Sequence, residues 1–359
     1  MNITIVGCGN IGTQLAVHCA EKNNRVTMYG SKPEKIQKQL FIQNENGEII
    51  HSGSIYQATN DPEKAFSDAE LIIITMPAYC MQMLSELIYQ FVRDGVKICL
   101  IPGTGGGECA FAKSIEKGAI VFGLQRVPSV ARLLRYGETV IATGYRNELF
   151  VASLPKKYGE ECRSLIEDLL EIKSSLLPDY LNLTLTPSNP ILHTVRLRCL
   201  FEDYIEGKAY DRNPLFYEEW NDKTSELIFK CDDEVQQICS KLTDFDLSYV
   251  KPLKQHYESN TPAELTAKIR SIKGFKGLSS PMKQTENGYV PDFDSRYFTA
   301  DFPFGLSILC QIADFVGIDV PNMKATYDWY KNICLVNDEF RYSDYGINSS
   351  IEFINYYKK

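Results

Sequence analysis

Short apolar runs alternate with longer segments of helical periodicity over the first half of the chain. An apolar run of roughly 4–8 residues between turn residues is typical of a strand buried in a parallel sheet. We predict strands at residues 3–6, 26–29, 71–76, 97–101, 119–123 and 140–143, and helices at 79–91 and 160–170. This alternation is typical of a doubly wound α/β fold, so we predict a Rossmann domain over residues 1–180.

Helical periodicity dominates the rest of the chain, where strand signals fade. Amphipathic segments cover residues 194–206, 225–243 and 306–316. Three prolines and a β-rich run at 180–186 interrupt the periodicity within residues 177–190. We therefore place the domain boundary in that segment and predict an all-helical second domain over residues 181–359.

The first predicted strand runs directly into Gly7, Gly9 and Gly12, which open a helix. In a dinucleotide-binding turn the first glycine allows the sharp bend and the second lets backbone N–H groups approach a pyrophosphate. The third lets the helix pack close to the strand. We predict that these glycines, with Asn10 and Ile11 in the first helical turn, bind NAD or NADP. An ordinary glycine turn between a strand and a helix is the alternative.

The end of the second predicted strand bears on the choice between NAD and NADP. NAD sites of this fold usually have an acid there that binds the ribose 2′-hydroxyl, whereas this chain has Tyr29-Gly30-Ser31-Lys32. The hydroxyl of Ser31 and the ammonium of Lys32 favour a 2′-phosphate, so we predict NADP, with a plain solvated turn as the alternative.

Pro77 and Gly103 follow two further strands and are also predicted to line the cofactor site, although a glycine-rich surface loop fits residues 103–107 as well.

Length and composition limit the remaining classes of function. The chain has 359 residues, 44% of them hydrophobic, and a net charge of -8, which suits two soluble domains and argues against nucleic acid or an anionic membrane as partner. No targeting segment precedes the first strand and no apolar run could span a membrane, so we expect a cytoplasmic protein. The eleven cysteines show no metal-binding spacing, so we expect reduced core thiols and assign no metal.

Two segments of the second domain carry candidate chemistry. The run from Ser188 to His193 resembles a helix start, with Asn189 as N-cap and Pro190 at the first helical position. A histidine there could exchange a proton near neutral pH, or it could be a satisfied core residue. Arg296 and Asp301 precede another helix, where they could form a simple ion pair or bind a carboxylate and orient a histidine.

Together these segments resemble the opine dehydrogenases, the octopine and nopaline dehydrogenase family. The resemblance covers nearly the whole chain. Its motifs are the glycine turn, Met76-Pro77-Ala78, Pro102-Gly103, Gln125-Arg126-Val127-Pro128 with Arg132 and Gly137, Asn189-Pro190-Ile191-Leu192-His193, and Arg296-Tyr297 through Asp301-Phe302-Pro303-Phe304-Gly305-Leu306, up to about Trp329. The chain departs from the family at Ala300, where glutamate is common, and at Thr194, where proline is frequent.

The resemblance implies an NAD(P)H-dependent oxidoreductase that condenses an amino acid with an α-keto acid. It implies a catalytic dyad of His193 and Asp301, with Arg296 binding substrate carboxylate. We add Gln125 and Asn189 as candidate substrate ligands and Arg126 as a weaker candidate cation. The alternatives are a ketopantoate or 2-hydroxyacid reductase and a non-catalytic dinucleotide sensor. The oligomeric state stays open, with a homodimer as one candidate.

Overall fold

The computed structural model describes residues 1–336 and 338–359, and the chain divides into two compact units. The first contains Met1–Thr184 together with Tyr357–Lys359, and the second contains Leu185–Tyr356. The end of the chain therefore belongs to the first unit, where the Tyr357 hydroxyl donates a hydrogen bond to the buried Glu108 carboxylate at 2.8 Å.

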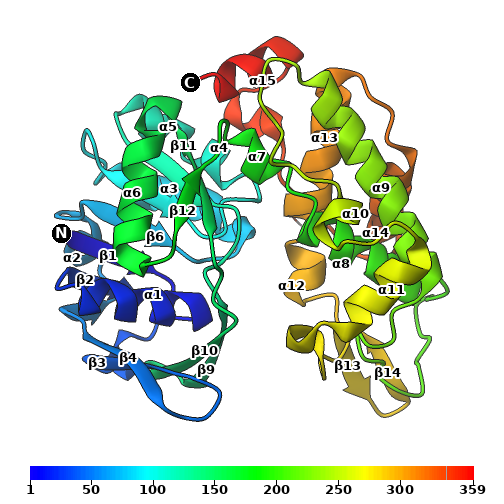
Figure 1. Ribbon diagram of the computed structural model, residues 1–359, viewed down its shortest axis with the longest axis horizontal. Coiled ribbons are helices and arrows are strands. Elements are labelled where there is room, and N and C mark those ends of the chain that lie inside the picture. The colour runs from blue at the N-terminus through cyan, green and yellow to red at the C-terminus, as the bar shows by residue number, and fades with distance from the viewer. Residues whose placement is uncertain (337) are drawn as a thin grey trace. The chain divides into compact units, whose positions relative to one another are not determined.

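An eight-stranded sheet forms the centre of the first unit, in the order β12-β11-β8-β7-β6-β1-β2-β5 (Figure 1). Neighbours pair in parallel except β8 and β11, which are antiparallel. The strands are β1 (Asn2–Val6), β2 (Arg25–Tyr29), β5 (Gln57–Thr59), β6 (Leu71–Ile74), β7 (Lys97–Leu100), β8 (Ile120–Leu124), β11 (Leu149–Leu154) and β12 (Ser174–Leu176). Every residue of β6 is buried, as expected for a parallel strand covered on both faces.

The helices of this unit connect the strands. They are α1 (Asn10–Glu21), α2 (Pro62–Phe66), α3 (Met81–Tyr89), α4 (Gly107–Ala110), α5 (Ala112–Glu116), α6 (Gly159–Leu170) and α7 (Leu181–Thr184), with 3-10 turns η1 (Pro33–Lys35), η2 (Ala78–Cys80) and η3 (Lys156–Tyr158). Helices α1 and α6 contact each other beside the sheet (Figure 1). The predicted Rossmann architecture is confirmed, because helices connect β1 to β2, β5 to β6, β6 to β7 and β7 to β8, all of which lie in one parallel part of the sheet.

A second sheet in the first unit was not predicted. Its order is β4-β3-β10-β9, with β3 (Gln39–Gln43), β4 (Ile49–Ser54), β9 (Val130–Arg135) and β10 (Thr139–Thr143). The predicted strand at 140–143 exists, but it belongs to this sheet rather than to the main one. Several of these strands mix polar and apolar positions, so an analysis that looked for continuous apolar runs missed them.

Helices make up most of the second unit. They are α8 (Asn189–Leu200), α9 (Asp222–Lys241), α10 (Leu253–His256), α11 (Pro262–Ser271), α12 (Arg296–Thr299), α13 (Ser307–Val316), α14 (Pro321–Ile333) and α15 (Ser350–Tyr357), with the short turns η4 (Lys273–Phe275), η5 (Phe302–Leu306, π-helical) and η6 (Tyr342–Tyr345). The expectation of an all-helical domain is wrong in one place, since β13 (Met282–Thr285) and β14 (Gly288–Pro291) form a hairpin. The β-rich interpretation of residues 180–186 is also wrong, because Leu181–Thr184 is a buried helical turn.

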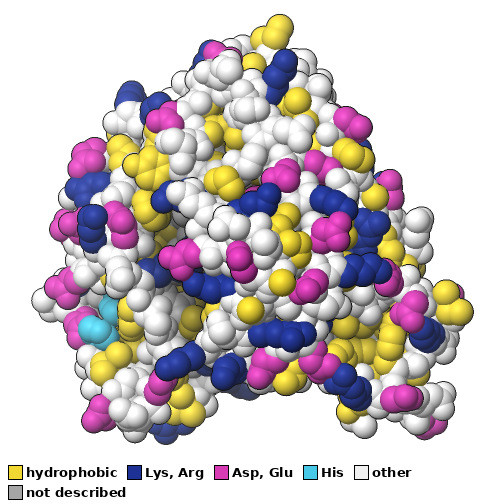
Figure 2. Space-filling model, turned by 45° about the vertical axis from the view of Figure 1, so that its right-hand side comes forward, with side chains coloured by type: hydrophobic (Ala, Val, Ile, Leu, Met, Phe, Trp, Pro, Cys, Tyr) yellow, Lys and Arg dark blue, Asp and Glu magenta, His cyan; other side chains and the backbone are white. Residues whose placement is uncertain are grey.

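The described helices, the cysteines and the surface charges show which kinds of site the chain can offer. No described helix combines the length and the apolar composition needed to cross a membrane. All eleven cysteines are free, and none is exposed. Basic and acidic side chains are interspersed over the face that Figure 2 shows, so an anionic ligand needs a local cationic site.

Candidate active site

The turn between β1 and α1 is closely packed around its glycines. Gly7 has φ of 105°, a conformation that favours glycine. A Cβ atom at Gly12 would lie 1.8 Å from the Gly7 carbonyl oxygen, so the helix can begin this close to the strand only with glycine at position 12. A Cβ at Gly9 would meet no atom within 4 Å, so Gly9 borders open space.

The first turn of α1 offers backbone donors to an anion. Gly9 is the N-cap and supplies no side-chain hydrogen bond to the N–H groups at the start of the helix. The side chain of Asn10 faces another partner, since its Oδ1 accepts a hydrogen bond from the Leu133 N–H of β9 at 2.9 Å. Free donors at a helix N-terminus, beside a glycine with open space, fit the pyrophosphate of a dinucleotide.

The end of β2 lies next to this turn. The Gly7 N–H donates to the Tyr29 carbonyl at 3.0 Å. Ser31 and Lys32 follow, both are exposed, and no acidic residue stands between Tyr29 and Lys32. Among the described residues Lys32 forms no ion pair. A hydroxyl and an unpaired ammonium are therefore available at the position where this fold binds the adenosine ribose.

The other predicted cofactor residues lie at the same edge of the sheet. Pro77 comes shortly after β6 and is the N-cap of η2. Gly103 follows β7 but is buried, with its N–H donating to the Leu124 carbonyl at 2.7 Å. A Cβ at Gly103 would lie 2.8 Å from the Cα of Gly123, so this glycine lets the loop pack against β8. Its contact with a cofactor stays a prediction.

His193 and Asp301 lie side by side in the second unit, although they are far apart in sequence. His193 is on α8, and its Nδ1 lies 2.8 Å from Oδ2 of Asp301. Their side chains are 12% and 19% exposed, so the pair is largely buried but remains accessible. Because an ionised carboxylate only accepts hydrogen bonds, Nδ1 carries the proton and Nε2 of the neutral ring is an acceptor.

Close packing of η5 on the start of α8 brings the two side chains together. Asp301 immediately precedes η5 and its carbonyl accepts a hydrogen bond from the Leu306 N–H at 2.9 Å. A Cβ at Gly305 would lie 3.1 Å from Cγ of Pro190, which is tighter than most side-chain contacts. Glycine at position 305 thus lets η5 approach α8 and places Asp301 beside His193.

Tyr217 completes this group, and the sequence analysis missed it. Its hydroxyl lies 2.9 Å from Nε2 of His193. The ring is 4% exposed and stacks on Phe275 with 4.0 Å between ring centroids. Burial raises the pKa of Tyr217 well above its ordinary value, so the hydroxyl stays protonated. It therefore donates a hydrogen bond to Nε2 of the neutral ring. No motif marks this tyrosine, because its segment 213–220 contains several aromatic residues and no helical period.

Helix α8 also anchors the segment that carries Tyr217. Arg196, one turn after His193, donates from Nε to the Phe216 carbonyl at 2.9 Å and from a terminal nitrogen to the Glu219 carbonyl at 3.1 Å. Burial lowers the pKa of Arg196 to about 10, which still leaves it charged at neutral pH. The Tyr297 ring packs on His193, with 4.6 Å between centroids. The imidazole is therefore held by hydrogen bonds on both nitrogens and by an aromatic face.

The predicted substrate ligands are placed differently. Arg296, the first residue of α12, is exposed and forms no ion pair among the described residues. Asn189 is exposed and is the first residue of α8, so the N-cap is Ser188 and the expected cap position is wrong by one residue. Gln125 and Arg126 belong to the first unit, where the Gln125 N–H donates to the Phe150 carbonyl at 2.9 Å. Their contact with a substrate stays a prediction.

Family models match both parts of the chain. The model of the α-helical domain of NAD/NADP octopine/nopaline dehydrogenases matches residues 176–334. The model of the N-terminus of NAD-dependent glycerol-3-phosphate dehydrogenases matches residues 2–117. The first match contains His193, Tyr217, Arg296 and Asp301, and the second contains the glycine turn.

Two relatives and two solved structures show the extent of the similarity. Tauropine dehydrogenase of Arabella iricolor is 26% identical over 92% of this chain and 91% of its own length, and octopine dehydrogenase of Mizuhopecten yessoensis is 27% identical over 76% and 71%. The structure of an octopine dehydrogenase with NADH and L-arginine aligns with a TM-score of 0.84 at 21% identity, covering 99% of this chain and 98% of that one. The NADP+-bound structure of a yersinopine dehydrogenase aligns with a TM-score of 0.68 at 13% identity over 92% and 90%.

Proposed function

Because the chain belongs to the octopine and nopaline dehydrogenase family, we propose that it condenses an amino acid with an α-keto acid and reduces the product with NAD(P)H. The hydrogen-bonded series Asp301, His193 and Tyr217 carries this proposal. It joins a largely buried acid to an imidazole in the unit that the family model matches. A plain cofactor-binding protein would have no need of such a group.

The reaction requires one proton, for loss of the hydroxyl, and one hydride, for the reduction. The amine attacks the keto carbon, and loss of the resulting hydroxyl as water forms a C=N bond. Reduction of that bond adds a hydride to carbon and leaves a secondary amine with two carboxylates; NAD(P)H, held at Gly7, Gly9 and Gly12, supplies the hydride. His193 acts as the acid that protonates the departing hydroxyl, and Asp301 stabilises the imidazolium while the ring is charged.

Tyr217 and Arg296 take supporting roles in this proposal. The Tyr217 hydroxyl donates to Nε2 of the neutral ring, and its oxygen accepts from Nε2 when the ring is protonated. Tyr217 therefore orients the ring on the side opposite Asp301. Arg296 is an exposed guanidinium next to Tyr297, which packs on His193. A guanidinium binds a carboxylate through two parallel hydrogen bonds, so Arg296 is our candidate for holding one substrate carboxylate.

For the cofactor we propose a preference for NADPH over NADH, based on Ser31 and Lys32. A Lys32→Glu variant should bind NADPH at least about tenfold more weakly, because a carboxylate would replace the ammonium beside the 2′-phosphate, while NADH affinity changes little. Fluorescence titration with both cofactors measures this. A Lys113→Glu variant makes the same charge change at an exposed site on α5 and is the control. Equal affinity for both cofactors in the wild type and in Lys32→Glu would contradict the preference.

The function is tested by following NADPH and NADH oxidation with pyruvate, glyoxylate or 2-oxoglutarate, each with and without a panel of amino acids. We expect oxidation only when an amino acid is present, and a secondary amine dicarboxylate by mass spectrometry. Keto acid reduction without an amine would instead show a 2-hydroxyacid reductase. Cofactor binding without turnover on any pair would show a sensor.

A further inference from the structure

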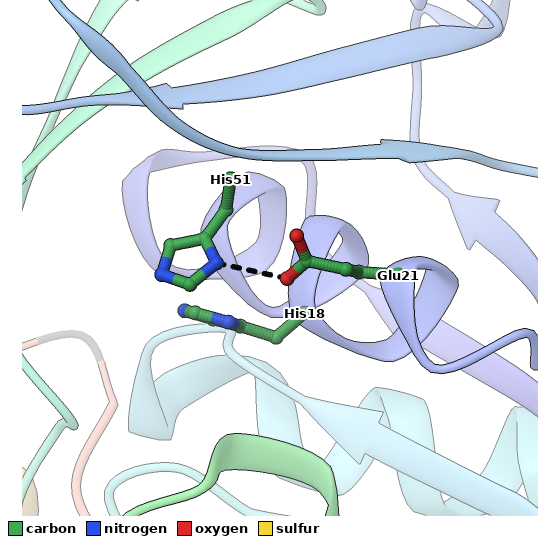
Figure 3. A group of neighbouring side chains, drawn as sticks. All are labelled: His18, Glu21 and His51. Atoms are coloured by element: carbon green, nitrogen blue, oxygen red, sulfur yellow. Dashed lines mark hydrogen bonds and ion pairs between the residues drawn. The ribbon is translucent and has the colours of Figure 1, made fainter.

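A cluster of potential metal ligands lies in the first unit, apart from the glycine turn. His18 and Glu21 stand three residues apart on α1, and His51 is on β4. One ligand atom of each residue lies within 4.8 Å of the others. Figure 3 shows the two imidazoles and the carboxylate facing one another, with Nδ1 of His51 2.8 Å from Oε2 of Glu21.

Close contact between α1 and β4 produces this arrangement. A Cβ at Gly53 would lie 2.7 Å from the Val17 carbonyl oxygen and 2.8 Å from Cβ of Ala20, so glycine lets the strand approach the helix. His51 stands two residues before Gly53 and therefore faces the same side of the strand. The helix spacing places His18 and Glu21 on one face, which makes the three side chains converge.

The two imidazoles are unfavourable neighbours when both are charged. Their rings meet edge to face, with 4.7 Å between centroids. His18 is 5% exposed, and burial, followed by the His51 charge, lowers the pKa of His18 to about 4. His18 is thus neutral at physiological pH, the form in which histidine binds metals. The nearby cation, Lys22, is paired with Glu171.

We propose that His18, Glu21 and His51 bind a divalent transition metal, with Zn²⁺ as the ion of choice and water as the fourth ligand. Two histidines and one glutamate form a known zinc ligand set. Tetrahedral bonds of about 2.0–2.1 Å separate ligand atoms by about 3.4 Å. Ligand atoms as far as 4.8 Å apart must therefore approach by about 1.4 Å, and Nδ1 of His51 and Oε2 of Glu21, now 2.8 Å apart, must separate slightly. Glu21 and His51 are partly exposed and can supply that movement.

The surroundings favour a cation here. The cluster lies in the last turn of α1, where the helix dipole is negative. The Tyr145 hydroxyl lies 3.2 Å from Nε2 of His18, an outer-shell contact that fixes the ring. A bound ion would connect α1 to β4 at the end opposite the glycine turn, so its expected effect is to stabilise the first unit rather than to take part in the reaction.

Calorimetric titration of the full-length, chelator-treated protein with ZnCl₂ tests this proposal. We expect one ion per chain, a higher Tm with Zn²⁺, and at least about tenfold weaker binding in His51→Gln and in Glu21→Gln. Both residues are partly exposed, so these variants should fold. His256→Gln, which changes an exposed histidine on α10, is the matched control and should bind like the wild type.

X-ray absorption on the zinc-loaded protein identifies the ligands. Nitrogen and oxygen at about 2.0–2.1 Å with no sulfur at about 2.3 Å would support the cluster, whereas sulfur scattering would assign the ion to a cysteine and overturn the proposal. Wild-type affinity in His51→Gln, or no binding by the wild type, would likewise show that His51 and Glu21 form a surface ion pair only.

Discussion

Replacing His193 by alanine is expected to lower kcat by about a hundredfold or more, which corresponds to about 2.7 kcal/mol of activation free energy. The imidazole lies between the Asp301 carboxylate and the Tyr217 hydroxyl, so its removal takes away the group that delivers the proton. Steady-state NADPH oxidation with the best substrate pair measures kcat. Cofactor affinity, measured separately by fluorescence, should stay near the wild-type value, because the glycine turn belongs to the other unit.

Variants of Asp301 and Tyr217 show whether these residues and His193 act as one catalytic unit or contribute independently to kcat. Asp301→Asn should lower kcat by a comparable factor. The double variant, His193→Ala with Asp301→Asn, should have a kcat little lower than that of either single variant, because the two residues act together. Tyr217→Phe keeps the ring that stacks on Phe275 and removes only the hydroxyl. We expect a loss of about tenfold with a changed pH profile, since Nε2 loses its donor. A kcat within about threefold of the wild type in His193→Ala would reject the dyad.

The parts of the fold that the sequence predicts are those set by local pattern. The strand before Gly7 and the helix that contains Gly12 follow from an apolar run, a glycine spacing and a helical period, and the structure has both elements there. The sheet formed by β3, β4, β9 and β10 depends instead on pairing between distant segments. Its half-polar strands give a weak local signal, so the pattern could not show which strands pair.

The same difference between local sequence pattern and packing of distant segments applies to the candidate site. His193 and Asp301 were predicted because their segments resemble those of the opine dehydrogenases, in which a histidine and an aspartate form the catalytic dyad. Tyr217 has no such segment, and its place next to His193 depends on the Arg196 side chain, which holds the carbonyls of Phe216 and Glu219. The His18 and His51 cluster was missed for a similar reason, since only the packing of Gly53 on α1 brings β4 to the helix.

Alanine at Gly12 and alanine at Gly9 should affect the glycine turn in different ways. In Gly12→Ala the new Cβ would lie 1.8 Å from the Gly7 carbonyl oxygen, so α1 must move away from β1. We expect a loss of about 3 kcal/mol, which lowers Tm by about 6–12 °C for a unit of this size, and cofactor binding at least about tenfold weaker. Thermal unfolding followed by circular dichroism, with NADPH titration, measures both effects.

Gly9→Ala is the matched variant, because its Cβ would meet no atom within 4 Å and the residue has an extended backbone that alanine can adopt. Its Tm should therefore stay within about 2 °C of the wild type, while NADPH affinity still falls about tenfold or more, since the methyl group would occupy space next to the pyrophosphate. Unchanged NADPH affinity in Gly9→Ala would show that the pyrophosphate does not bind at this turn. An unchanged Tm in Gly12→Ala would show that contact with Gly7 does not limit how close α1 lies to β1.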